Sequence, residues 1–195
     1  MDELAEEKRI LELIGAGDAA GFDLLVERFA PRLFRYALRM CGDESEAEDA
    51  LQETFLTVQE KIGQFRGEGR LRNWLYKITG NACLQKHRAN KGRRVTELRL
   101  DDIMTHEDRI TEEPPSWRLD PAEQALSAEM AQRLEQAITQ IPETNRQVLI
   151  LRDVEGLSTR ETALALDITE ETVKVRLHRA RAFVRRLLKD YFEGK

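Results

Sequence analysis

Apolar side chains recur three or four residues apart along almost the whole chain, and no segment alternates apolar and polar residues as a half-buried strand would. The clearest stripe follows Asp18, a residue type that often caps a helix, and it consists of Phe22, Leu25, Phe29, Leu33, Tyr36 and Met40. Pro31 lies within this stripe and is expected to kink the helix or to split it. A chain with this single period buries its apolar stripes by packing helices on one another. The sequence therefore predicts an all-α fold.

Capping signals indicate further helices in the first half of the chain. Ser45 and Glu48 have the spacing of a capping box, and the helix that it opens would carry Ala50, Leu51, Phe55, Val58 and Ile62. Residues 63–70 contain glycines and mixed charge and are expected to form a loop. The inner stripe of the next helix would be Leu71, Leu75, Ile78 and Ala82. These helices are enough for one domain, which we assign to residues 1–94.

The middle of the chain has the composition of a linker. Residues 95–120 are acidic, contain a Pro-Pro pair and show little periodicity. Asp120 and Pro121 then have the arrangement of an N-cap followed by a first-turn proline, which restarts the helical pattern. We therefore expect two small helical domains joined by an acidic linker, the second covering residues 121–195.

The second domain ends in the pattern of a helix-turn-helix. A short helix would begin at the capping box of Ser158 and Glu161, a turn of about four residues would follow around Asp167 and Ile168, and Thr169 would cap the last helix. This arrangement would place the N-terminal half of the last helix in the major groove of DNA.

The last helix is strongly basic in a chain whose net charge is -5, because residues 172–188 hold six Lys or Arg side chains and no acid. Its inward stripe would be Val173, Leu177, Ala180, Val184 and Leu187. Its first residues would read bases, whereas Arg181, Arg185 and Arg186 would lie near phosphates or in water. The alternative is an amphipathic surface helix whose basic face is simply solvated.

Charge elsewhere in the chain is also sorted into blocks. Residues 43–60 contain seven acids and no base, residues 70–94 contain eight bases and no acid, and residues 101–129 contain nine acids and two bases. Such blocks suit different partners, or they are solvated helix faces.

The basic block at 70–94 is interleaved with aromatic and amide side chains. On a helix, one face would carry Trp74, Lys77, Asn81, Gln85 and Arg88. A basic face with a ring and amides suits single-stranded nucleic acid, because bases stack on rings and amides read base edges. The alternative interpretation makes Trp74 and Tyr76 core anchors and Asn81 an ordinary surface residue. We favour that interpretation for Tyr76 and function for Asn81, and Trp74 fits either.

Several classes of protein do not fit the sequence. The acidic N-terminus lacks the features of a secretory signal, and no apolar run approaches the ~20 residues of a membrane helix, so a cytoplasmic location without membrane insertion is expected. Cys41 and Cys83 are expected to be buried thiols without metal or redox function, because neither has ligand spacing. Three scattered histidines form no catalytic or metal pattern, so we expect neither an enzyme, a metal site nor a cofactor.

Three stretches, in order, resemble hallmark segments of the extracytoplasmic-function (ECF) sigma factors: DALQETFLTVQEKIGQFRG, NWLYKITGNACLQKHR and IPETNRQVLILRDVEGLSTRETALALDITEETVKVRLHRAR. The resemblance implies that the first domain is sigma region two and the second is region four. The protein would then be an alternative, non-catalytic specificity subunit of RNA polymerase, in a family that serves stress responses.

The resemblance also implies site residues. Core polymerase would be bound, at the clamp helices of its beta-prime subunit, by Asp49, Gln52, Glu53 and Phe55. The -10 element, with one base flipped from the non-template strand, would be contacted by Phe65, Arg66, Arg70, Trp74, Lys77, Asn81, Gln85 and Arg88. The -35 element would be read by Lys174, Val175, His178 and Arg179, with its phosphates held by Thr172 and Arg176.

The implied partners are core polymerase, including its beta flap, promoter DNA in duplex and single-stranded form, and a cognate anti-sigma factor. Family members often carry a small polar or basic residue where Val175 stands, and His178 occupies a variable position, so the resemblance implies no particular promoter sequence. Two alternatives remain: a sigma-like decoy that titrates an anti-sigma factor, and a free-standing helix-turn-helix regulator.

Overall fold

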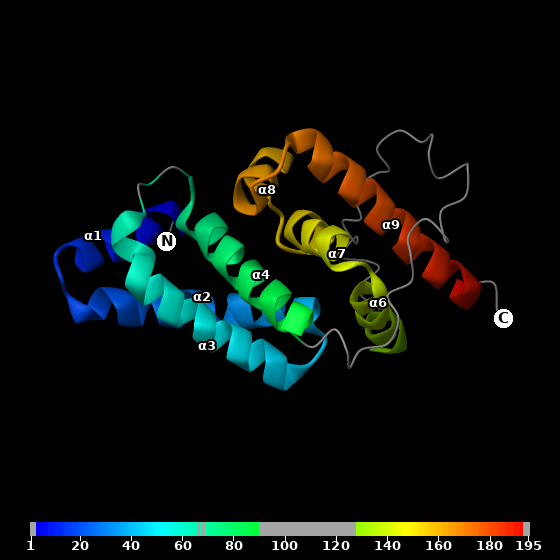
Figure 1. The fold of residues 1–195 in the computed structure, drawn as a ribbon, viewed down its shortest axis with the longest axis horizontal. Helices are drawn as coiled ribbons and strands as arrows, with labels where there is room; N and C mark the ends of the chain where they lie inside the picture. Colours follow the sequence, from blue (N-terminus) through cyan, green and yellow to red (C-terminus); the bar gives the residue numbers. More distant parts are fainter. Residues whose placement is uncertain (1–2, 66, 68, 90–127, 193–195) are drawn as a thin grey trace. The chain divides into compact units, whose positions relative to one another are not determined.

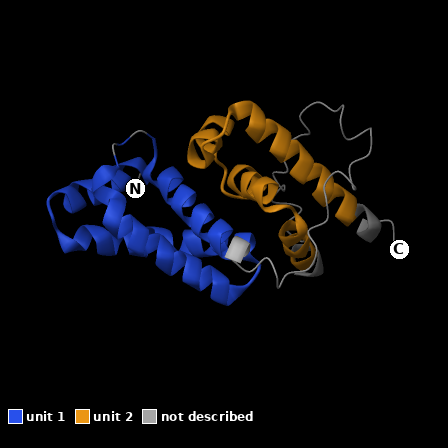
Figure 2. Ribbon diagram, in the orientation of Figure 1, with its two compact units in different colours: residues 1–92 blue, residues 93–195 orange. Residues whose placement is uncertain are grey.

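The computed structural model describes residues 3–65, 67, 69–89 and 128–192, and every regular element among them is helical (Figure 1). The expected all-α fold is therefore confirmed. The chain forms two compact units, residues 1–92 and residues 93–195 (Figure 2). The predicted linker at 95–120 and the predicted cap at Asp120 lie outside the described residues.

Four α-helices build the first unit: α1 (Glu3–Gly15), α2 (Ala19–Cys41), α3 (Glu44–Lys61) and α4 (Leu71–Ala89). The helices α2, α3 and α4 pack against one another, and α1 packs on α2 (Figure 1). Their shared core includes Leu25, Leu33, Tyr36, Leu75 and Tyr76, all fully buried. A short 3-10 turn, Ile62–Gln64, follows α3 and leads into the loop before α4.

Helix α2 is continuous through Pro31, so of the two outcomes expected there, a kink or a split, the split does not occur. Proline at this position removes one hydrogen bond to the carbonyl of Glu27, and both residues are exposed, so water can satisfy that carbonyl. The predicted Asp18 cap is confirmed, because its carboxylate accepts a hydrogen bond from the Ala20 amide at 3.0 Å. Gly42 ends the helix in the left-handed conformation, with φ 73°.

Helix α3 begins before the predicted capping box. Asp43 is its N-cap, with a carboxylate that accepts from the Glu46 amide at 2.9 Å, so the predicted cap at Ser45 is wrong. An earlier start places Glu44 and Glu46 in the first turn, where negative charge is favourable.

The second unit contains α6 (Ala128–Gln140), α7 (Glu143–Leu149), α8 (Thr159–Leu166) and α9 (Glu170–Phe192). A π-helical turn, Ile150–Val154, continues α7. The long α9 packs on α6, α7 and α8. The core of the unit holds Ile141, Ile150, Leu151, Leu157 and Phe183.

Two arginines, the buried Arg146 and the half-buried Arg152, donate hydrogen bonds to backbone carbonyls beside helices of this second unit. Arg146 donates to the carbonyls of Ile141 and Thr139, at the C-terminal end of α6. Arg152 donates to the carbonyl of Leu157, just before α8. Carbonyls in the last turn of a helix lack partners within the helix, so Arg146 stabilises the turn that follows α6, whereas Arg152 stabilises the segment that leads into α8. Of the helices described, none is long and apolar enough to cross a membrane.

Candidate nucleic-acid interface

The helix-turn-helix predicted near the end of the chain is present as α8 and the start of α9. The capping box is confirmed: the Ser158 amide donates to the Glu161 carboxylate at 2.9 Å, and the Glu161 amide donates to the Ser158 hydroxyl at 3.1 Å. Asp167 makes the turn in the left-handed conformation, with φ 57°. Thr169 caps α9 by accepting from the Thr172 amide at 3.1 Å. The turn spans residues 167–169 and is thus one residue shorter than expected.

The start of α9 divides cleanly into a packed side and an open side. The packed side consists of Val173, Leu177, Ala180 and Val184, as predicted, although Leu187 is only half-buried and Leu188 is buried in its place. On the open side, the exposed side chains are Lys174, Val175 and Arg179, and the half-buried ones are Thr172, Arg176 and His178. The six residues expected at the -35 element are therefore all accessible to some degree within the first turns of the helix.

Arg181 corrects the sequence interpretation of α9. Its side chain is 5% exposed and makes two hydrogen bonds to the Asp153 carboxylate, from Nε at 2.8 Å and from Nη2 at 2.7 Å. The two hydrogen bonds form a bidentate ion pair between the guanidinium and the carboxylate. Asp153 belongs to the π-helical turn after α7. Arg181 therefore fixes α9 to this turn and does not face phosphates or water, whereas Arg185 and Arg186 are exposed.

The second predicted surface lies on α4. Asn81 and Gln85 are exposed, and Trp74 and Lys77 are half-buried. Tyr76 is buried against Tyr36, with ring centroids 5.1 Å apart, so the expected core role is confirmed. The side chain of Arg88 lies outside the described residues, as does Arg66.

The loop before α4 is held at its start by an aromatic contact. Phe65 lies against Trp74, with ring centroids 5.5 Å apart and the planes tilted by 49°. Trp74 is therefore neither a core anchor nor a free ring. Gly67 and Gly69 have φ of 72° and 114°, which side-chain-bearing residues rarely adopt, so glycine allows the loop to turn here.

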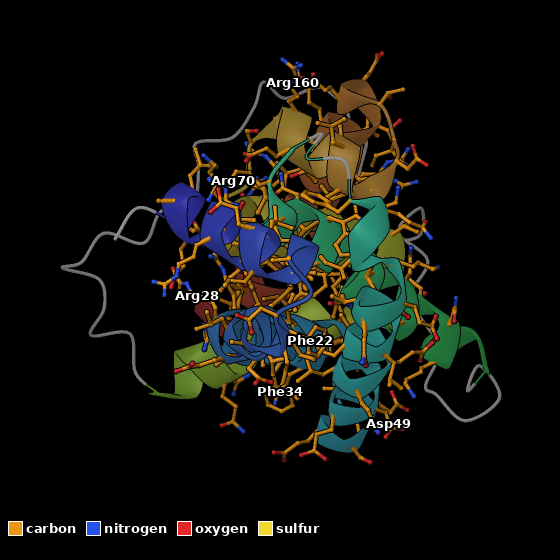
Figure 3. All side chains as sticks on the ribbon, turned by 90° about the vertical axis from the view of Figure 1, so that its left-hand side faces the viewer. Phe22, Arg28, Phe34, Asp49, Arg70 and Arg160 are labelled. Carbon is orange, nitrogen blue, oxygen red and sulfur yellow. The ribbon has the colours of Figure 1, made fainter. Side chains whose placement is uncertain are left out.

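Arg70 holds the other end of the loop through carboxylates from α1. Its Nε donates to the Glu7 carboxylate, 3.3 Å from Oε1 and 3.2 Å from Oε2, and its Nη2 lies 3.1 Å from Glu3 Oε2 (Figure 3). The hydrogen bond to Glu7 and the charges of Glu7 and Glu3 raise the pKa of Arg70, against the effect of burial. The guanidinium therefore stays charged.

Sequence analysis did not identify Glu3 and Glu7 as part of this site. Like charges four residues apart on a helix repel each other, so a pair of acids at this spacing indicates that basic partners face them. Arg70, the last residue of the loop, and Arg72, in α4, are those partners, with Arg72 Nη1 3.2 Å from Glu3 Oε2. The contact joins residues more than sixty positions apart, which a local pattern does not show.

Helix α3 carries the third predicted surface. Asp49 and Gln52 are exposed, and Glu53 and Phe55 are half-buried (Figure 3 labels Asp49). Phe55 packs edge-on against Phe22 at a centroid distance of 6.4 Å, and Asp49 pairs with Lys86 of α4 at 3.2 Å. Leu56, which sequence analysis passed over, is 56% exposed beside these residues. Leu56 could have been found in the sequence, because it is an apolar residue that does not belong to the apolar stripe of the helix.

The two cysteines are buried in the first unit and form no disulfide. A hydrogen bond with the Cys41 thiol, together with burial, raises the pKa of Cys83, so this thiol is neutral near pH 7. Within the described part of the chain, no three His, Cys, Asp or Glu side chains are grouped as a metal site would require.

Comparisons with known proteins follow the division into two units. Residues 25–93 match the model of Sigma-70 region 2, and residues 131–184 match the model of Sigma-70, region 4. The first match begins within α2, after α1, and extends through α4, and the second includes α8 and the first part of α9.

Relatives are similar over most of the chain. RNA polymerase sigma-H factor of Pseudomonas aeruginosa is 32% identical over 186 residues, covering 94% of each chain. ECF RNA polymerase sigma factor SigM of Mycobacterium tuberculosis is 32% identical over 89% of this chain and 80% of its own. ECF RNA polymerase sigma factor SigW of Bacillus subtilis is 28% identical over 96% of this chain and 99% of its own.

Solved structures have the same fold. CnrH, in complex with the cytosolic domain of CnrY, aligns with a TM-score of 0.67 at 22% identity over 94% of this chain and 97% of its own. RpoE of Bartonella quintana, in complex with the anti-sigma factor NepR, aligns with a TM-score of 0.63 at 24% identity over 86% of this chain and 96% of its own. The matched regions and the relatives at 32% identity show that this chain belongs to the ECF RNA polymerase sigma factors.

Proposed function

We propose that this sigma factor binds core RNA polymerase, directs it to promoters with -35 and -10 elements, and opens the DNA at the -10 element. The observation that carries the proposal is the presence of two different polar surfaces. The α9 surface is a basic helix face that suits duplex DNA. The α4 surface combines a loop, a ring pair and an exposed amide, which suits unpaired bases.

In the proposed -35 complex, the start of α9 enters the major groove. Lys174 and Arg179 are exposed cations that can donate to base edges, and exposed Val175 can contact a thymine methyl group. Thr172 and Arg176 lie at the margin of this face, where they would bind phosphates. The buried pair of Arg181 and Asp153 would set the angle at which α9 projects.

In the proposed -10 complex, a base extruded from the non-template strand enters the space between the loop 65–70 and Asn81. The exposed Asn81 amide can hydrogen-bond the edge of that base, and the rings of Phe65 and Trp74 provide an apolar wall beside it. Lys77 and Gln85 would follow the strand on the same helix face, with Arg88 and Arg66 as further cationic contacts. Base capture would stabilise the open state without ATP hydrolysis.

Docking on the polymerase is assigned to α3. The helix presents an exposed acid, Asp49, an exposed amide, Gln52, and a half-buried acid, Glu53. This acidic surface suits a basic partner such as the beta-prime clamp helices. Phe55 and the exposed Leu56 would add an apolar centre to this polar surface. The second unit would bind the beta flap.

A cognate anti-sigma factor and a cytoplasmic location complete the proposal. Both solved structures with the same fold are complexes, one with the cytosolic domain of CnrY and one with the anti-sigma factor NepR. The net charge of -5 opposes indiscriminate binding of the free protein to DNA. We therefore expect weak promoter binding by the chain alone and specific binding with core polymerase.

Transcription from a matched promoter with purified core polymerase tests this function. A sigma factor yields a specific transcript and an open complex only when both proteins are present. A decoy would bind an anti-sigma factor without supporting transcription, and a free-standing regulator would bind its promoter tightly alone at physiological salt. Either of these two results would contradict the proposal.

A further inference from the structure

Helix α1 precedes the part of the chain that matches Sigma-70 region 2, yet its side chains reach the start of α4. Glu7 lies at the centre of this contact and is only 4% exposed. A carboxylate is rarely so deeply buried without charged or hydrogen-bonding partners. The partners of Glu7 therefore indicate what it does.

The first partner is the backbone of α4. Glu7 Oε2 accepts a hydrogen bond from the amide of Leu71, the first residue of that helix, at 3.1 Å. The first turn of α4 contains no acid of its own. The N-terminus of a helix is stabilised by negative charge, whereas Arg70 and Arg72 place positive charge there. Glu7 thus supplies from α1 the carboxylate cap that the local sequence lacks.

The second partner is Arg70, the last residue of the loop. Glu7 accepts from its Nε, and Glu3 lies within ion-pair distance of Arg70, of Arg72 and, at 3.3 Å, of Arg32 on α2. The side chain of Arg70 is only 27% exposed in this network. Its charge is therefore directed to α1 and is poorly placed to bind a phosphate.

The loop 65–70 is consequently held at both ends. Phe65 packs on Trp74 at one end, and Arg70 is bound to Glu7 at the other. Between them, Gly67 and Gly69 allow many backbone conformations. Without the contact to Glu7, this segment would have one fixed end and more conformations to lose on binding a base.

We propose that Glu7, assisted by Glu3, is a positioning residue for promoter opening, which holds the loop and the start of α4 in the arrangement that captures the extruded base. This inference rests on the -10 role proposed above. Arg70 then acts through Glu7 and not by a direct phosphate contact. Helix α1 becomes part of the -10 machinery although it lies outside the matched region.

The test uses holoenzyme reconstituted from the full chain and core polymerase. Glu7→Ala removes the cap and the charge, whereas Glu7→Gln keeps an oxygen that can accept from the Leu71 amide. Glu12→Gln is the matched control, because Glu12 is on the same helix, is 65% exposed and pairs only locally with Lys8. Each variant is assayed for core occupancy, thermal unfolding and open-complex formation.

Glu7→Ala is expected to reduce open-complex formation on duplex promoter about tenfold, as the loss of a charge-assisted hydrogen bond implies. Glu7→Gln should lose less, and Glu12→Gln should match the unsubstituted protein. Core occupancy should not change. On DNA mismatched open across the -10 element, both Glu7 variants should recover, a rescue that a general folding defect would not produce.

A separate arm measures how binding depends on salt. If Arg70 acts through Glu7, Arg70→Ala leaves the salt slope of promoter binding unchanged, whereas a lost phosphate contact would lower it by about one. A lowered slope, a persistent defect of Glu7→Gln on mismatched DNA, or increased DNA binding by Glu7→Ala would overturn the inference. The last result would mean that the acids compete with DNA for Arg70 and Arg72.

Asn81→Ala in the same assays distinguishes this inference from the proposed function. If mismatched DNA rescues Asn81→Ala but neither Glu7 variant, the -10 role stands and the positioning role of Glu7 fails. If mismatched DNA rescues none of the three variants, opening by α4 itself is wrong.

Discussion

The two candidate DNA surfaces are built in different ways. The α9 surface consists of neighbouring residues on one helix, and the caps of α8 at Ser158 and of α9 at Thr169 are local. The α4 surface combines a helix, a loop and carboxylates from α1, which meet only in the folded first unit. A surface carried by a single helix can change its sequence preference residue by residue, whereas a surface assembled from several elements loses its geometry when any of its supports is changed.

The largest expected effect tests whether Arg181 belongs to the core of the second unit and not to the DNA-facing surface of α9. Arg181→Ala would leave the Asp153 carboxylate, which is 13% exposed, without its partner, and losing one member of a largely buried pair costs about 3 kcal/mol. The free energy of unfolding, measured with urea on the full chain, should fall by this amount for the transition of the second unit. Arg185→Ala, at an exposed position of the same helix, is the control and should change it by less than about 0.5 kcal/mol.

Unfolding of Arg181→Ala at the same urea concentration as the control would contradict this assignment. A loss of DNA affinity without a loss of stability would instead return Arg181 to the DNA-facing side of α9.

The next effect compares the two surfaces directly. Asn81→Ala and Lys174→Ala should each lower output from duplex promoter about tenfold or more, because a lost base contact costs about 1–3 kcal/mol. On DNA mismatched open across the -10 element, Asn81→Ala should recover, since its base is needed to hold the open state. Lys174→Ala should not recover, because the -35 duplex is still to be read.

Both side chains are exposed, so thermal unfolding should be unchanged and serves as the control. If mismatched DNA rescues both variants equally, or rescues neither, the division of roles between α4 and α9 is wrong.

A third effect separates polymerase docking from both DNA surfaces. Gln52→Ala combined with Glu53→Lys removes one amide from α3 and reverses the charge at position 53. The double change should weaken core binding about tenfold, because the new lysine would face a basic surface of the polymerase. Competition with another sigma factor for core polymerase measures this loss. Binding of the variant chain to -35 duplex should be unchanged, and unaltered core occupancy would disprove the docking assignment.

The smallest effect refines the α9 surface. Val175 is 45% exposed, and truncation to alanine removes two methyl groups that can contact a thymine methyl. At about 0.8 kcal/mol for each buried methylene-sized group, we expect a loss of a few-fold up to about tenfold on a promoter with thymine at the contacted position. Replacing that thymine by uracil should lower binding of the unsubstituted protein and abolish the difference between the two proteins. A difference that persists on uracil DNA would exclude the methyl contact.

Much of the fold could be predicted from the sequence because its signals are local. The apolar stripe of α2, the Asp18 cap and the capping box of α8 depend on residues within one or two turns. Local signals also misled, since Ser45 and Asp43 are both good caps and the helix begins after Asp43. The sequence left open whether Pro31 kinks the helix or splits it in two, and α2 continues through it.

The candidate site was predicted best where charge and exposure coincide. Lys174 and Arg179 lie on the open face of α9, and Asn81 lies on the open face of α4, as the helical period requires. Trp74 could not be assigned from the pattern, because its environment depends on the position of Phe65 in a loop. Glu7 was not found at all, because its partner is 63 positions away.

By itself, the sequence determined most of the helices, the caps at Asp18, Ser158 and Thr169, and the open face of α9, because a helix places side chains according to their spacing alone. Only the tertiary structure decided which charges are available to a partner. Arg181 and Arg70 look like the other basic residues of their segments, yet each is bound to a carboxylate from another element. The physical reason is that a charged side chain leaves water when a partner of opposite charge meets it, and the fold alone determines which residues meet.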